Sequence, residues 1–199
     1  MGDFFIFIGK SGSGKGTQAE LLEKYLEEKN PQRPVLWYGS GKYFRELIKG
    51  DGYTQGLARE IDRKGALQPA FLAVHIWSHF FIEELKGDED VILDGTPRKH
   101  DEALMLDGAL EFYGAKVFVL LVDVSREWAK EKLLGRGRGD DTKEAIEKRL
   151  DWFDEEVLPT VAFYEKHPRH RFFRINGEQT IDDVHKEIVD KMKKANIKM

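Results

Sequence analysis

A lysine and a threonine stand in a glycine-rich stretch near the start of the chain. The stretch GKSGSGKGTQ, residues 9–18, follows the apolar run FFIFI and precedes a segment with helically spaced leucines. Glycines lack a Cβ, so successive backbone N–H groups can form an anion-sized nest, and the following helix directs its positive end at that nest. Lys15 adds a charge for the outer phosphates, and Thr17 supplies the nearest hydroxyl for a phosphate or its Mg²⁺. A glycine-rich turn without a ligand would not need all of these features, so we predict a loop that binds a nucleoside triphosphate.

Gly16 separates the lysine from the hydroxyl residue and narrows this prediction. A lysine followed by Gly-Thr-Gln resembles the nucleoside monophosphate kinases, and the adenylate kinase family in particular. Further segments resemble motifs of this family in the same order along the chain: YGSGKYFREL (38–47), RKGALQP (63–69), VILDGTPRKHDEA (91–103), LLGRGRGDDT (133–142) and EKRL (147–150). The resemblance spans essentially the whole chain, and five separated matches argue against accident.

The resemblance implies two nucleotide sites and one metal. The ATP site would contain eight residues: Gly12, Ser13, Gly14, Lys15, Gly16, Thr17, Arg136 and Gln179. The AMP site would contain eight others: Ser40, Gly41, Arg45, Ala66, Gln68, Gly95, Arg98 and Glu102. Asp94 would hold Mg²⁺ through water, with Thr17 as a further contact. Pro97 is a candidate for a cis peptide bond on the same grounds.

Arginine suits the chemistry that this resemblance implies. Phosphoryl transfer needs positioning and charge neutralisation rather than covalent chemistry, and the planar guanidinium fork binds phosphate oxygens in pairs. Arg45 and Arg98 would bind the phosphate of the monophosphate, and Arg149 would clamp the transferred group together with Arg138. The implied catalytic residues are Lys15, Arg98, Arg138 and Arg149. Taken singly, each arginine would be interpreted as a solvated surface group; the matched motifs favour the functional role.

Three departures from the family pattern affect loops. Ser11 replaces the usual proline of the phosphate loop and should leave that loop less restrained. Lys42 stands where the family has an aspartate after Ser-Gly. This change removes a water-mediated partner of the metal and adds a positive charge nearby; alternatively, the Lys42 side chain points to solvent. The lid is very short, because only Gly137 separates Arg136 from Arg138. Two arginines this close cannot easily reach both the adenine and the γ-phosphate of ATP.

A fourth departure concerns the base of the monophosphate. Glu102 stands where a glutamine typically reads the adenine of AMP. A carboxylate accepts from the amino group of adenine but also from N1–H and the amino group of guanine. We therefore predict a kinase for ATP and AMP, with a CMP/UMP-, GMP- or dTMP-preferring kinase as an alternative. A nucleotide-binding module with reduced turnover is a second alternative, motivated by Lys42 and the short lid. The segment GALQP, which resembles the family's base-contact segment, argues against a third alternative, another small-molecule kinase with this loop.

Short apolar runs alternate with helical patterns, which predicts a parallel sheet covered on both faces. The expected strands are Phe4–Ile8, Val35–Tyr38, Val91–Leu93, Val117–Val122 and Phe172–Ile175. The expected helices are Thr17–Glu28, Leu67–Leu85, Ser125–Leu134, Thr142–Lys166 with a bend or break at Pro159, and one capped by Thr180. We expect the α/β fold class, of the three-layer type with about five parallel strands that nucleoside triphosphatases with this loop adopt, with a small helical monophosphate-binding insertion and a very short lid.

One domain accounts for the length of 199 residues. We expect a core of residues 1–39, 71–135 and 142–199, an inserted monophosphate-binding lobe at about 40–70, and a minimal lid at about 136–141. The chain has no cysteine, which excludes disulfides and thiolate metal sites. A net charge of −4 argues against nucleic acid as a partner. No apolar window has the length of a membrane span, and the N-terminus lacks a basic region and a cleavage site. We expect a cytoplasmic monomer.

Overall fold

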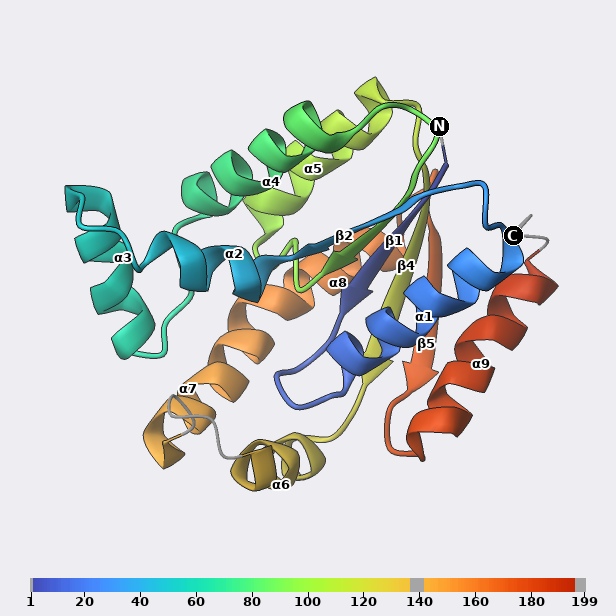
Figure 1. Cartoon of the computed structure of the whole chain (residues 1–199). Coiled ribbons are helices and arrows are strands. Elements are labelled where there is room, and N and C mark those ends of the chain that lie inside the picture. Colours follow the sequence, from blue (N-terminus) through green and yellow to red (C-terminus); the bar gives the residue numbers. More distant parts are fainter. Residues whose placement is uncertain (1, 137–141, 196–199) are drawn as a thin grey trace.

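A single parallel sheet forms the centre of the protein (Figure 1). The computed structural model describes residues 2–136 and 142–195. Within these ranges the sheet has five strands in the order β2-β3-β1-β4-β5. Their bounds are β1 Asp3–Ile8, β2 Val35–Gly39, β3 Asp90–Asp94, β4 Lys116–Asp123 and β5 Arg171–Asn176. Every predicted strand is confirmed, and so is the α/β fold class.

Both faces of the sheet are covered, as the continuous apolar runs require. Phe4, Ile6 and Ile8 of β1 pack under α4 (Ala70–Glu84), α5 (His100–Phe112) and α8 (Leu158–Glu165). The alternate residues Phe5 and Phe7 pack under α1 (Lys15–Lys29) and α9 (Ile181–Lys194). Figure 1 shows these two layers on opposite sides of the strands. No helix in the described ranges is both long enough and apolar enough to cross a membrane.

Proline determines where two of the helices begin. α4 begins at Ala70, later than the predicted start at Leu67, because Pro69 is extended and disfavours helical backbone in the residue before it. The predicted segment Thr142–Lys166 is divided just before Pro159. It consists of α7 (Lys143–Trp152), a π-helical turn over Phe153–Val157, and α8, in which Pro159 lies in the first turn. Proline lacks the N–H that a continuous helix would use, so the division is physically expected.

One helix, α5, is absent from the predicted elements. Its buried stripe is Ala103, Leu106 and Leu110. Leu104 and Met105 lie in the same segment but are 52% and 58% exposed, and Phe112 at its end is 83% exposed. These exposed apolar residues blur the helical period in the sequence.

Three further helices surround the carboxyl ends of the strands. α2 (Ser40–Leu47) and α3 (Tyr53–Arg63) follow β2 and project away from the sheet (Figure 1). This segment is helical, as predicted for residues 40–70. α6 (Arg126–Arg136) follows β4 and packs against α7 through Leu133 and Ile146.

A cluster of polar side chains joins α5 to the turn between α8 and β5. Asp107 Oδ1 lies 2.7 Å from His170 Nε2, and Asp107 Oδ2 lies 3.5 Å from His167 Nε2. The two imidazole rings stack with centroids 4.0 Å apart. Arg169 Nη2 also lies 2.7 Å from Asp107 Oδ2. Because a guanidinium already bonds this carboxylate, we interpret the cluster as a structural contact between α5 and the turn before β5 rather than a metal site.

The buried His170 of this cluster predicts a pH dependence of stability. Burial lowers the pKa of His170 below its ordinary value of 6.5, reinforced by His167 and Arg169 and opposed by Asp107. As pH falls through about 6.5 the unfolded chain therefore binds more protons than the folded chain, and the free energy of unfolding decreases. In His170→Asn, which removes the titrating imidazole, this dependence should be shallower between about pH 7.5 and pH 5.5. The slope of the free energy of unfolding against pH cannot differ between the variant and the wild type by more than about 1.4 kcal/mol per pH unit, the value for one proton.

Urea unfolding at several pH values measures this dependence. His79→Asn, which changes an exposed histidine of α4, is the matched control and should retain the slope of the wild type. An unchanged slope in His170→Asn would contradict the prediction.

Candidate active site

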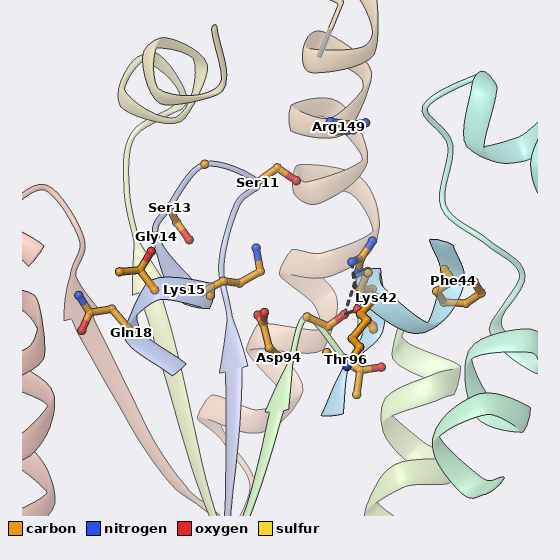
Figure 2. A pocket seen from close by; sticks show the side chains of 18 of the residues that line it. Ser11, Ser13, Gly14, Lys15, Gln18, Lys42, Phe44, Asp94, Thr96 and Arg149 are labelled. Carbon is orange, nitrogen blue, oxygen red and sulfur yellow. Dashed lines mark hydrogen bonds between the residues drawn. The ribbon is translucent and has the colours of Figure 1, made fainter. Parts of the chain in front are cut away.

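The carboxyl edge of the sheet carries the candidate active site. The register aligns Phe7 of β1 with Asp94 of β3, and Gly39 of β2 with the same Asp94. The loops that leave these three strands therefore start side by side, where open α/β sheets bind ligands. A pocket of about 1360 Å³ opens at this edge, and Figure 2 shows part of its lining.

The glycine-rich loop after β1 has the conformation of an anion nest. Gly12 and Gly14 have φ angles of +85° and +84°, which residues with a Cβ rarely adopt. A Cβ on Gly12 would also lie 2.6 Å from the carbonyl oxygen of Ala129. α1 begins directly afterwards, without a side-chain cap and without an acidic residue in its first turn. Its first N–H groups thus point to the loop, where the helix dipole favours an anion.

Lys15 and Asp94 lie beside this loop. Figure 2 shows both side chains between the loop and α7, with Arg149 on α7 above them in this view. Asp94 Oδ1 is buried and has no hydrogen-bond partner among the described residues. A Cβ on Gly16 would lie 3.4 Å from Asp94 Oδ2, so the bare glycine brings the start of α1 close to the carboxylate. An unsatisfied carboxylate beside a phosphate loop fits a hard cation such as Mg²⁺, which carboxylate oxygens hold.

The loop after β3 brings Arg98 toward the same place. Arg98 Nε donates to the carbonyl oxygen of Gly95 at 2.8 Å, and Arg98 Nη2 donates to Ser40 Oγ at 3.1 Å. Ser40 Oγ in turn donates to the carbonyl oxygen of Gly95 at 2.8 Å. Gly95 has φ +73°, and a Cβ there would lie 3.0 Å from Ser40 Oγ and 3.3 Å from Arg98 Nη2. Glycine at this position therefore permits the guanidinium to be held in one orientation. The peptide bond between Thr96 and Pro97 is cis, as expected from the resemblance.

Positive charge predominates on the pocket wall. Among the residues that the structure describes, seven cationic ones line it, against five acidic ones: Lys15, Lys42, Arg45, Arg98, Lys99, Lys132 and Arg149 against Glu20, Glu23, Asp62, Asp94 and Glu102. Burial lowers the pKa of Arg98, reinforced by Arg149 and opposed by Glu102 and Asp94. The carboxylates of Glu102 and Asp94 thus offset the repulsion between Arg98 and Arg149.

Glu102 bonds the loop that carries Arg98. Its side chain is 2% exposed. One carboxylate oxygen accepts from Thr96 Oγ1 at 2.5 Å, and the other accepts from the backbone N–H of Arg98 at 2.8 Å. Burial raises the pKa of Glu102, and these two hydrogen bonds oppose the rise. The predicted base contact thus already has two partners within the protein.

The predicted site residues gather in one place. Every predicted ATP, AMP, catalytic or metal residue whose side chain is described lines the same pocket, including the distant Ala66, Gln68 and Gln179. The side chain of Arg136 and all of Arg138 lie outside the described residues. Lining residues that were not predicted include Trp37, Trp128 and Trp152. Trp152 could have been suspected from the sequence only because it is an aromatic residue shortly after Arg149.

A phosphate loop after the central strand of this parallel sheet, facing an arginine-rich pocket, defines a nucleotide-dependent phosphotransferase. The sequence model of the family described as adenylate kinase matches residues 7–169. The chain belongs to the adenylate kinase family.

Curated relatives agree over nearly the full chain. The adenylate kinase of Nautilia profundicola is 34% identical over 98% of this chain and 96% of its own length. The adenylate kinase of Prochlorococcus marinus is 32% identical over 92% and 94%. Adenylate kinase isoenzyme 1 of Caenorhabditis elegans is 30% identical over 98% and 90%. The prediction of a nucleoside monophosphate kinase is thereby confirmed.

The bond between Thr96 and Glu102 predicts a cost for losing one hydroxyl. Thr96→Val keeps the shape of the side chain but leaves a buried carboxylate oxygen without its donor. The free energy of unfolding should fall by about 1–3 kcal/mol, measured by urea unfolding. Thr96→Ser, which restores the hydroxyl, should recover most of this loss. A Thr96→Val variant as stable as the wild type would contradict the assignment of this hydrogen bond.

Proposed function

We propose that the protein catalyses the reversible, Mg²⁺-dependent reaction ATP + AMP ⇌ 2 ADP. One observation carries the proposal: the phosphate loop and the segments expected to bind a monophosphate line one continuous pocket. A protein that only bound ATP would need the loop but not a second set of arginines. A kinase needs both, because donor and acceptor must be held together.

The phosphate loop would hold the donor, ATP. The N–H groups from Gly12 to Thr17 and the Lys15 ammonium would surround its outer phosphates. Gln179 lines the same pocket, and its Nε2 donates to the carbonyl oxygen of Asn176 at 2.8 Å. Its role toward ATP, like that of Arg136 toward adenine, is proposed from the resemblance.

Arg98 and Arg45 would hold the phosphate of the acceptor, AMP. Arg98 is already fixed by Gly95 and Ser40, so little side-chain entropy is lost when it binds a phosphate. Arg45 lies on α2, one helical turn after Gly41. A Cβ on Gly41 would be 3.1 Å from Arg45 Nη1, so the glycine leaves room for the guanidinium. We assign the sugar and base to Ala66 and Gln68, in the segment between α3 and α4.

Transfer would proceed in line between these two ends. A phosphate oxygen of AMP attacks the γ-phosphorus of ATP, the bond from that phosphorus to the β,γ-bridging oxygen breaks, and ADP leaves. Lys15 and Arg149 would neutralise the charge on the equatorial oxygens, with Arg138 assigned to the same task. Mg²⁺, held by Asp94 through water and contacted by Thr17, would neutralise further phosphate charge. No covalent intermediate with the protein is needed.

AMP is the acceptor that we propose. The names of the relatives support it, whereas the carboxylate of Glu102 is also compatible with other bases. We further propose that residues 40–70 form the monophosphate-binding lobe and that residues 136–141 form the lid. The protein would work as a cytoplasmic monomer that binds no nucleic acid, consistent with its net charge of −4.

A panel of acceptors tests the proposal. Purified protein with ATP and Mg²⁺ should form diphosphate fastest with AMP, and more slowly with CMP, UMP, GMP or dTMP. Lys15→Met should lower kcat about 100-fold or more, because it removes a charge from the transition state, and should leave the unfolding transition unchanged.

Three outcomes would overturn parts of the proposal. If no acceptor gives a diphosphate although ATP binds, the protein is a binding module. Equal rates with all acceptors would reject AMP specificity. A faster reaction with an acceptor that is not a nucleotide would point to another kinase activity.

A further inference from the structure

Trp152 joins the segment expected to bind the monophosphate base to the rest of the site. It is the last residue of α7, and its indole Nε1–H donates to the carbonyl oxygen of Gly65 at 3.2 Å, across 87 positions of sequence. Gly65 belongs to the connection between α3 and α4, which continues to Ala66 and Gln68. This bond therefore links a projecting segment to a helix of the core.

The backbone at Gly65 is shaped for this contact. Gly65 has φ +65°, and a Cβ on it would lie 3.4 Å from the Cα and 3.5 Å from the Cβ of Ala145. Ala145 lies two helical turns before Trp152 on α7, on the same side of the helix. The connection thus meets α7 at two levels, and Figure 1 shows the two segments next to each other.

The ring of Trp152 also contacts the arginine expected to hold the acceptor phosphate. The guanidinium carbon of Arg98 lies 5.6 Å from the centroid of the Trp152 ring, within the range of a cation–π interaction. The edges of that guanidinium donate to Gly95 and Ser40. One indole therefore bonds the base segment through its N–H and faces the phosphate arginine through its ring.

We propose that Trp152 is a positioning residue that sets the distance between the base segment and Arg98. A monophosphate spans these two elements, so both must be held at the spacing that its sugar allows. The N–H bond to Gly65 would hold one end, and the ring would hold the other. The proposal rests on the function proposed above, since it assigns this role at the acceptor end of that site. Phenylalanine keeps a flat ring at this position but cannot donate, whereas alanine removes both contacts.

Steady-state kinetics of Trp152→Phe and Trp152→Ala test the role. Loss of one neutral hydrogen bond predicts a KM for AMP about threefold to tenfold higher in Trp152→Phe, with the KM for ATP unchanged. Trp152→Ala should raise the KM for AMP further and also lower kcat, because Arg98 loses its stacking partner. Phe112→Ala changes an exposed aromatic residue of α5 and should match the wild type. Thermal unfolding and ATP binding of each variant serve as controls for the fold.

The outcomes separate this inference from the proposed function. If the wild type forms no ADP, the proposed function fails and the role of Trp152 at that site fails with it. If the wild type is active but the KM for AMP in Trp152→Phe stays within twofold, the N–H does not position the base segment. If the KM values for AMP and ATP rise together, or the variant melts well below the wild type while AMP use is unaltered, Trp152 is structural only. A rise confined to AMP, in a variant that binds ATP normally, supports the proposal.

Discussion

Mutual repulsion among cations is the constraint on which this site depends. Lys15, Arg98 and Arg149 line one pocket, and fixed positive charges close to one another raise the free energy of the folded protein. Two carboxylates reduce this cost: buried Glu102 and half-buried Asp94 both act on the pKa of Arg98 in the direction opposite to burial. The acidic residues of the site therefore stabilise the basic ones in the folded protein.

The sheet supplies the geometry that this arrangement needs. Because β1 lies between β3 and β4, the phosphate loop after β1 and the arginine loop after β3 leave the same edge. Parallel pairing then sets their relative height, through the alignment of Phe7 with Asp94. Gly95 and Gly16 remove the side chains that would separate these loops. The spacing between the two loops is therefore set largely by the backbone of the paired strands.

Local features of the sequence predicted much of this structure, and contacts between distant residues were not predictable. The strands are predictable because both of their faces are buried, and the loop because glycines mark positive φ angles such as those of Gly12 and Gly14, which other residues rarely adopt. α5 was missed because apolar residues lie on its exposed face. Glu102 illustrates the limit: its motif position indicated a base contact, but only the fold reveals two donors already on its carboxylate. The bond from Trp152 to Gly65, across 87 positions, has no periodic signal at all.

The uncapped start of α1 would link the proposed nucleotide binding to the stability of the protein itself. A helix whose first turn has neither a side-chain cap nor an acidic residue gains its missing hydrogen-bond partners from an anionic ligand. A ligand that binds only the folded protein raises the free energy of unfolding. At ligand concentrations above Kd, this increase grows with the logarithm of the ligand concentration. If the proposed phosphate site is correct, the loop exchanges intrinsic helix stability for affinity, and the nucleotide concentration around the protein would set part of its resistance to unfolding.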